Sequence, residues 1–179
     1  PEGTVNRAAL PAIFNPEDLN ALELALQLKD RYGAKVIVGT MGMPAAAEVL
    51  RQSLYRGADE CVLITDRVLA GADTLATSYT LSCCVKKLGK IDLILCGRQA
   101  IDGDTAQVGP QLAEKLKAPQ LCYVEDVIEL THKKVTVKRA IEGGHEILES
   151  PLPALLTVIE ANEPRPMAGK KIMKYKRAK

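Results

Sequence analysis

Short apolar segments alternate with helical segments over most of the chain, and this alternation restricts the fold more than any other feature. Helical spacing of apolar residues, with capping residues at the ends, predicts helices at 15–33, 44–55, 73–88 and 105–116. The apolar segments predict strands at 35–40, 60–65, 91–96, 121–124 and 154–159. Strands this apolar are buried on both faces, as in a parallel sheet covered by helices on each side. The predicted fold class is therefore α/β.

The pattern changes after residue 127. Apolar and polar residues alternate up to residue 148, with turns at 131–134 and Gly143-Gly144, which predicts an antiparallel meander inserted before the last buried strand. Beyond Asn162 the chain carries prolines, Gly169 and basic residues, which indicate an extended arm leaving the domain. We therefore predict an α/β domain at 1–160 and a basic C-terminal arm at 161–179. The opening residues PEGT resemble a turn inside something longer, so an upstream segment is expected.

Composition excludes several classes of protein. The 179 residues suit one domain, and no apolar run approaches the ~20 residues that a membrane helix needs. The five cysteines form no CxxC pair, so buried, reduced thiols in a cytoplasm-like compartment are expected rather than disulfides or a zinc site. The two histidines, His132 and His145, fall in the polar meander, and the sequence contains no catalytic pattern.

The last ten residues, 170–179, hold six basic side chains and no acid, while the rest of the chain is mildly acidic. Such a tail either binds an acidic surface or is simply solvated, and both interpretations stay open. No nucleic-acid partner is expected.

Ligands of parallel sheets sit outside the carboxyl ends of the strands, so three loops, 39–44, 65–73 and 97–105, are candidates for function. The stretch GRQAIDGDTAQVGP at 97–110 is the most informative, because it follows a buried strand and runs into a helix. Gly97 and Gly103 permit close backbone approach, and Asp104 or Thr105 can cap the helix. The stretch suits a phosphate or the polar edge of a nucleotide; a simple capped turn is the alternative.

Side chains of this loop can also contact a nucleotide. Arg98 can reach a phosphate, or it can pair with a nearby acid. Gln99 and Gln107 can hydrogen bond to a base edge or to polar atoms of a flavin ring, unless they are ordinary surface residues. The loop lacks both the GK[ST] of a Walker A loop and the GxGxxG dinucleotide pattern, so its residues indicate only a capacity for anions.

Small and hydroxyl residues gather at the start of the helix predicted from residue 73. Thr74, Thr77 and Ser78 can share a helix face near the positive end of the dipole, where hydroxyls and free N–H groups can hold a pyrophosphate. Alternatively, Asp73 caps the helix and the other residues pack against the sheet. The sequence leaves these interpretations equal.

A third candidate lies where the strand at 35–40 meets the next helix. Gly42 allows the backbone to approach a flat ligand, and Met41 can pack on a ring. This pattern is weak on its own.

Several segments together resemble the electron-transfer flavoprotein beta subunit, or FixA family. They are the helix opening at Asn15-Pro16, GADTLATSY at 71–79, LILCGRQAIDGDTAQVGPQLAE at 93–114, PLPALLTV at 151–158, and NEPR at 162–165 followed by IMK at 172–174. They occur in the family's order over nearly the whole chain. The resemblance implies a Rossmann-like α/β fold, similar to adenine nucleotide hydrolases.

The resemblance also implies a role. The chain would be one half of a heterodimer whose alpha subunit carries the main redox FAD, in the cytoplasm of a bacterium or archaeon. It would be an electron carrier rather than an enzyme by itself. The pair would exchange electrons with NADH or an acyl-CoA dehydrogenase and with an acceptor such as ferredoxin or a quinone oxidoreductase. Family members carry a leucine anchor for dehydrogenases in the arm, where this chain has Gly169.

Ordinary members of the family bind AMP in the beta subunit, and electron-bifurcating members bind a second FAD. The DTLATSY form, with Gly103 and Thr105 in the long loop, favours FAD over AMP. The nucleotide site carried over by position consists of Asn15, Pro16, Asp18, Met41, Gly97, Arg98, Gln99, Ala100, Ile101, Asp102, Gly103, Asp104, Thr105, Ala106, Gln107 and Val108.

Two other functions stay open for a chain with this fold. One is a nucleotide-sensing module related in fold to universal stress proteins, with no redox role. The other is an ATP-pyrophosphatase, which needs an SGGxDS-like phosphate loop that the sequence does not contain.

Overall fold

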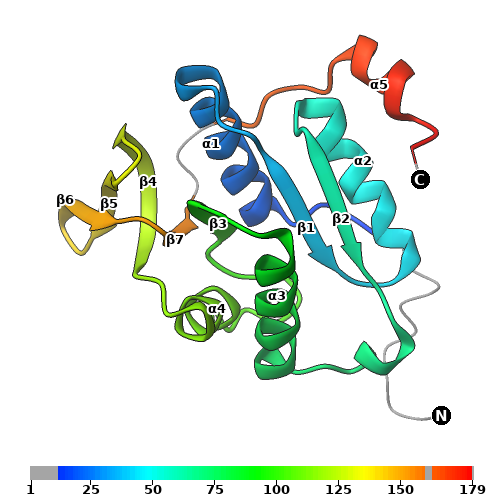
Figure 1. Cartoon of the computed structure of the whole chain (residues 1–179), viewed down its shortest axis with the longest axis horizontal. Coiled ribbons are helices and arrows are strands. Elements are labelled where there is room, and N and C mark those ends of the chain that lie inside the picture. Colours follow the sequence, from blue (N-terminus) through cyan, green and yellow to red (C-terminus); the bar gives the residue numbers. More distant parts are fainter. Residues whose placement is uncertain (1–11, 160–162, 179) are drawn as a thin grey trace.

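The computed structural model describes residues 12–159 and 163–178, which form an α/β fold in which helices flank a sheet containing parallel strands (Figure 1). The α-helices are α1 (Pro16–Tyr32), α2 (Ala47–Arg56), α3 (Thr74–Leu88), α4 (Val108–Leu116) and α5 (Gly169–Tyr175), with short 3-10 helices η2 (Pro44–Ala46) and η3 (Arg67–Leu69). The strands are β1 (Ile37–Met41), β2 (Glu60–Ile64), β3 (Leu93–Gly97), β4 (Gln120–Leu130), β5 (Lys134–Ile141), β6 (Gly144–Pro151) and β7 (Ala154–Val158). The predicted α/β class is confirmed.

The predicted ends of two helices are confirmed by their local geometry. Pro16 occupies the first turn of α1, where its missing N–H costs nothing, and Gly33 ends the helix at a φ of 70°. The Asp73 carboxylate accepts a hydrogen bond from Ala76 N and so caps α3, and Gly89 follows the last residue of that helix.

The sheet is divided into two parts. β1 and β2 pair in parallel by themselves, and the other strands form a second sheet in the order β3-β7-β4-β5-β6. Within the second sheet β3, β7 and β4 run parallel, and β5 and β6 are antiparallel additions. The sequence predicted one parallel sheet, but no strand in the described ranges hydrogen bonds to both β1 and β3.

This division corrects the expectation that the strands are buried on both faces. β7 is completely buried, because it lies between β3 and β4 and is covered by helices. In contrast, most residues of β1, β2 and β3 are only half-buried, since each of these strands is at the edge of its sheet. An edge strand is covered on fewer sides than a central one.

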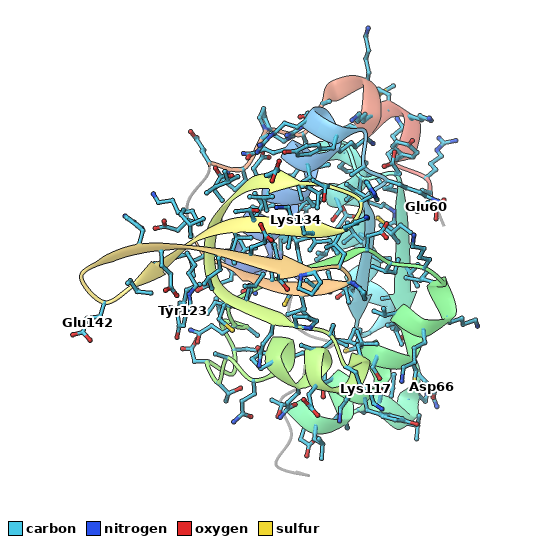
Figure 2. The ribbon with its side chains drawn as sticks, turned by 60° about the vertical axis from the view of Figure 1, so that its left-hand side comes forward. Glu60, Asp66, Lys117, Tyr123, Lys134 and Glu142 are labelled. Atoms are coloured by element: carbon cyan, nitrogen blue, oxygen red, sulfur yellow. The ribbon has the colours of Figure 1, made fainter. Side chains whose placement is uncertain are left out.

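β4 joins the parallel and antiparallel halves of the second sheet. Its register against β7 shifts between Leu121 and Val124, and Tyr123 within that interval has a φ of 60°. This is a β-bulge, which bends the strand. The predicted meander is confirmed, except that its first strand continues the strand predicted at 121–124. Figure 2 shows the β5–β6 hairpin projecting from the body with Glu142 at its tip.

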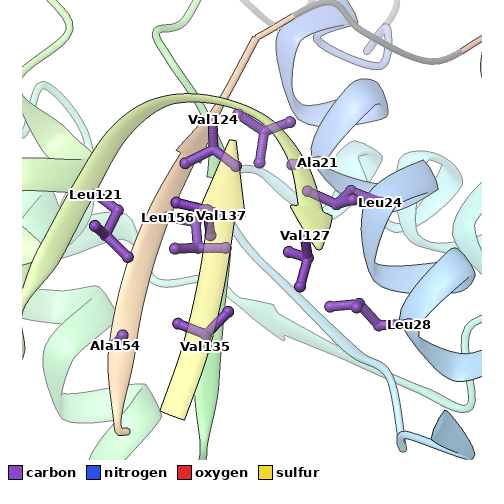
Figure 3. Packing of buried hydrophobic residues seen from close by; sticks show 11 residues of the cluster. Ala21, Leu24, Leu28, Leu121, Val124, Val127, Val135, Val137, Ala154 and Leu156 are labelled. Atoms are coloured by element: carbon purple, nitrogen blue, oxygen red, sulfur yellow. The ribbon is translucent and has the colours of Figure 1, made fainter. Parts of the chain in front are cut away.

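α1 packs on both sheets. Its Leu24 and Leu28 face the second sheet in a core shown in Figure 3. That core consists of Ala21, Leu24, Leu28, Leu121, Val124, Val127, Val135, Val137, Ala154, Leu156 and Val158. A different side of the same helix, with Leu22 and Leu26, packs with Val36, Leu54 and Ala58 next to β1 and α2. α1 therefore connects the two sheets through apolar contacts, the main favourable contribution to folding.

Contrary to the prediction, the C-terminal arm does not leave the domain. Arg165 binds the buried Glu23 of α1 through its backbone N–H (3.0 Å), Nε (2.9 Å) and Nη2 (3.0 Å), and its Nη1 lies 2.9 Å from Asp30 Oδ2. Burial acts to raise the pKa of Glu23, but the hydrogen bonds from Arg165 outweigh it, and the pKa falls below its ordinary value. The predicted boundary at 160/161 and Asn162 lie outside the described residues.

Beyond Arg165 the arm continues onto α2. Ala168 N donates to Tyr55 O (3.0 Å), and Arg51 Nε donates to Ala178 O (3.1 Å). Tyr175 and Ala178 also pack against the core shared by α1 and α2. Figure 1 shows α5 beside α2, so the arm is a short helix folded back on the domain.

Gly109 in the first turn of α4 has no room for a side chain, because a Cβ there would lie 2.7 Å from Thr157 Cγ2 and 3.0 Å from Cys96 Sγ. We expect Gly109→Ala to lower the free energy of unfolding by about 1–3 kcal/mol through overpacking. Gly103→Ala is the matched control, since nothing lies within 4 Å of its added Cβ. Urea unfolding of both variants checks this; equal stability would contradict the close packing of α4 on β7.

Arg165→Gln leaves the buried Glu23 carboxylate without its cation. At about pH 7 we expect a loss of about 3 kcal/mol in the free energy of unfolding. Because the folded pKa of Glu23 is lowered, the pair stabilises the protein above the ordinary pKa of 4.5, and this contribution disappears as the pH falls through the lowered value. The difference between wild type and variant should therefore shrink in acid, as measured by urea unfolding over a pH series.

Lys134→Gln is the control for that pair, because Lys134 and Glu149 are exposed partners on the hairpin. It should change stability far less than Arg165→Gln at neutral pH. A loss as large as that of Arg165→Gln would mean that burial of the Glu23–Arg165 pair does not account for the effect.

Candidate functional site

The start of α1 lies against the carboxyl end of β3. Asp18 Oδ1 accepts a hydrogen bond from Gly97 N at 2.8 Å. A Cβ on Gly97 would stand 2.5 Å from the Glu17 carbonyl carbon and 2.6 Å from Asp18 N, so only glycine fits. The exposed Pro16 is the first residue of the same helix. This contact brings residues 15–18 to the loop that follows β3.

Asn15 links α1 to that loop. Its Nδ2 donates to Gln99 O and to Asp18 Oδ2, both at 2.9 Å. Both partners are acceptors, so the amide nitrogen must point toward them and Oδ1 away. Oδ1 is buried and has no hydrogen-bond partner. Asn15 is the N-cap of α1, as predicted, but its side chain makes no cap hydrogen bond. Its acceptor atom Oδ1 is therefore available to a donor from outside the chain.

Arg98 is the one cation in the run 97–108, and it is paired. Its Nη2 lies 3.0 Å from Glu17 Oε1, and its backbone N–H donates to Val158 O. Its Nε is buried without a hydrogen-bond partner. A guanidinium carries five N–H donors, so Arg98 keeps donors for a further acceptor.

The loop after Arg98 is folded by local contacts. Gln99 Nε2 donates to Asp104 Oδ1 (2.7 Å), and Asp104 N donates to Ala100 O (3.0 Å). Asp104 and Ala106 have φ values of 48° and 52°, in a region that most side chains disfavour. Residues 100–105, including Ile101, Asp102, Gly103 and Thr105, are exposed.

α4 starts later than predicted. Neither Asp104 nor Thr105 caps it, because the positive φ values keep this segment out of the helix until Val108. The N-cap is Gln107, whose side chain makes no cap hydrogen bond. The first N–H groups of α4 therefore lack the carboxylate cap that α3 has.

The starts of α3 and α4 are joined, and the helices lie side by side (Figure 1). Thr74 Oγ1 donates to Gln107 Oε1 at 3.0 Å and accepts from Gln111 Nε2 at 3.4 Å. Ser78 Oγ lies 3.1 Å from Gln111 Oε1. Segments 73–78 and 97–108 thus adjoin.

The hydroxyl residues of α3 differ in their surroundings. Ser78 has no exposed surface and also donates to Leu75 O, so its hydroxyl is satisfied inside the protein. Thr77 is half-buried in the first turn, where its N–H donates to Asp73 O. Thr74 differs from Thr77 and Ser78, because its hydroxyl donates a hydrogen bond to Gln107 at the end of the loop.

Met41 and Gly42 end β1 on the smaller sheet. Gly42 N donates to Ile64 O at 3.0 Å, and a Cβ on Gly42 would stand 3.3 Å from Ala46 Cβ. Both residues are half-buried, and these contacts run to β2 and η2 rather than to the loop at 97–107.

Sequence reasoning missed two residues of this region. Glu17 faces Arg98, and Gln111 bridges Thr74 and Ser78. Gln111 follows Gln107 by four residues, so helical spacing could have placed it on the same face. Glu17 carried no comparable signal, because its partner is 81 residues away.

The thiols are free, and burial raises the pKa of Cys61 to about 11 and that of Cys96 to about 12. Cys83 is exposed and the other four cysteines are half-buried, which corrects the expectation of buried thiols. Within 12–159 and 163–178 no cluster of three or more metal-ligating side chains occurs. No helix in those ranges is long and apolar enough to cross a membrane.

Comparisons with a family model and with curated relatives point to the same family of proteins. Residues 2–179 match the electron transfer flavoprotein domain. The chain is 54% identical over 173 residues to the caffeyl-CoA reductase-Etf complex subunit CarD of Acetobacterium woodii, covering 96% of this chain and 66% of the relative. It is 54% identical over 172 residues to the electron transfer flavoprotein subunit beta of Clostridium acetobutylicum, with the same coverage of 96% and 66%.

A FixA protein of Azotobacter vinelandii is 49% identical over 168 residues, which cover 90% of this chain and 60% of the relative. The chain thus spans about two thirds of the length of the curated relatives that it matches. The match extends over all the segments that form the junction of α1, α3, α4 and the loop at 97–107. The chain belongs to the electron transfer flavoprotein family, among the relatives named as its beta subunit or FixA.

Proposed function

We propose that this chain is the beta-subunit half of an electron transfer flavoprotein and binds an adenine nucleotide where α1, α3 and the loop at 97–107 meet. The supporting observation is a pair of unsatisfied polar atoms there, Asn15 Oδ1 and Arg98 Nε. Buried polar atoms are normally hydrogen bonded. An acceptor and a charged donor that both lack a partner at the same junction therefore favour a polar ligand. A nucleotide matches both, with an amino group on its base and an anionic phosphate.

Each part of the junction would have its own role. Asn15 would accept from an amino group, and Arg98 would bind a phosphate oxygen. Thr74 and the uncapped start of α4 would supply further donors at the other side. The full proposed set is Asn15, Pro16, Asp18, Met41, Gly42, Asp73, Thr74, Thr77, Ser78 and residues 97–108. Residues 100–105 are exposed, so this part of the loop would be accessible to a ligand.

We propose FAD as the ligand, with AMP as the alternative. Small residues stand beside the junction at Ala72, Ala76 and Gly103, and they favour a ligand larger than a single phosphate group. FAD, when bound, supplies the electron-carrying chemistry. The chain's own residues would hold the nucleotide, orient it and set the local charge.

The partner would be an alpha subunit, forming a heterodimer in the cytoplasm. Two relatives are named as the beta subunit of an electron transfer flavoprotein and as a subunit of a caffeyl-CoA reductase-Etf complex, which supports assembly with other chains. In this arrangement the chain acts as an electron carrier. The pair would exchange electrons with NADH or an acyl-CoA dehydrogenase and with ferredoxin or a quinone oxidoreductase.

The first test is the nucleotide content of the full-length protein purified with its alpha subunit. We expect two FAD per heterodimer after extraction, measured by absorbance and chromatography. One FAD together with AMP would reject the two-flavin form and keep the nucleotide site. AMP or another nucleotide without flavin would favour a nucleotide-sensing module. Absence of any adenine nucleotide beyond the alpha-subunit FAD would reject the proposed site.

Thr74→Val tests the hydroxyl at the junction. It removes the donor to Gln107 and the acceptor for Gln111, and we expect about tenfold weaker binding of the nucleotide to the heterodimer. Thr80→Val on the same helix is the matched control, because its hydroxyl donates only to Ala76 O of its own helix. Calorimetric titration measures both; an equal effect of the two substitutions would remove Thr74 from the site.

A further inference from the structure

The junction carries an excess of negative charge. Segments 15–18, 73–78 and 97–108 contain five carboxylates and a single cation, Arg98. Three of these acids accept hydrogen bonds from neutral groups: Asp18 from Gly97 N, Asp73 from Ala76 N, and Asp104 from Gln99. Glu17 differs from those three, because its partner is the cation itself.

The geometry holds this ion pair in place. Glu17 is the second residue of α1, and its Oε1 lies 3.0 Å from Arg98 Nη2. Gly97 lies against the α1 backbone at Glu17, so the backbones on both sides of the pair are fixed. The exposed fractions of the two side chains, 20% for Glu17 and 38% for Arg98, leave the guanidinium the more accessible partner.

We infer that Glu17 is a positioning residue that aims Arg98 and weakens the attraction of this cation for a phosphate. This inference rests on the proposed nucleotide site and adds a residue to it. An anion bound to Arg98 also experiences the charge of Glu17, which repels it. The guanidinium keeps donors besides the Nη2 that faces Glu17, among them its unsatisfied Nε, for an acceptor on a ligand.

Removal of the Glu17 charge should therefore increase the affinity of the site for a phosphate. Glu17→Gln keeps the size of the side chain and leaves Arg98 with its full charge. A phosphate should then bind more tightly, by about three- to tenfold at low salt, because one repelling charge within a few ångströms has gone. The gain should diminish as salt increases, since screening reduces the interaction of exposed charges. Arg98→Gln should weaken binding.

The experiment is a double-mutant cycle in the full-length heterodimer after removal of its bound nucleotide. Wild type, Glu17→Gln, Arg98→Gln and the double variant are titrated with AMP and, separately, with FAD, by calorimetry at two salt concentrations. We expect Glu17→Gln to tighten binding in the wild-type background and to have a clearly smaller effect in the Arg98→Gln background. Glu17→Asp, which retains the charge on a shorter chain, should lie nearer to wild type than Glu17→Gln.

Several results would overturn the inference. They are weaker or unchanged binding in Glu17→Gln, or an equal effect of that substitution with and without Arg98. Glu149→Gln on the hairpin is the charge-matched control and should leave affinity unchanged, because its partner Lys134 is far from the junction along the chain. Wild type that binds neither nucleotide beyond the alpha-subunit site would reject the proposed function and this inference together. Wild-type binding without a Glu17 effect rejects only the inference.

Discussion

The close contact between the start of α1 and the end of β3 is the constraint on which the site depends. Gly97 has no side chain, and a Cβ there would collide with the backbone at Glu17 and Asp18. Because the two backbones can approach, the Asp18 carboxylate reaches Gly97 N, and Asn15 reaches the carbonyl of Gln99. The same helix packs apolar residues on both sheets, so the helix that joins the two halves of the fold also positions the polar groups at their edge.

The way in which these polar groups are satisfied changes the expected manner of binding. From the sequence, free N–H groups at strand ends and helix starts were the expected phosphate ligands. In the structure the Gly97 N–H is bonded to Asp18, and the Ala76 N–H at the start of α3 is bonded to Asp73. A phosphate would have to displace these carboxylates, which costs charge-assisted hydrogen bonds. The unused donors are on Arg98 and at the uncapped start of α4, so binding there requires no such exchange.

Local signals in the sequence were sufficient for most helices but not for their arrangement. Pro16, Gly33, Asp73 and Gly89 mark helix ends through their own backbone and capping chemistry, and the structure agrees with each. The late start of α4 was not predictable, because positive φ values at Asp104 and Ala106 depend on how the loop is held. Division of the sheet was missed for a similar reason: strand pairing joins residues distant in sequence, and apolar composition alone does not specify partners. In the site, hydroxyls and glutamines were found by type, whereas the Glu17–Arg98 pair required the fold.

The C-terminal arm also depends on a contact between residues distant in sequence, and this contact makes the arm part of the domain. Its composition, with prolines and lysines, predicts an extended tail, and nothing local indicates that it folds back. The partner of Arg165 is Glu23, 142 residues earlier, near the middle of the helix that carries the site residues at its start. A carboxylate as buried as Glu23 is tolerated in α1 only because this cation satisfies it. The arm is therefore part of the structure that holds α1 in place, rather than an appendage to a finished domain.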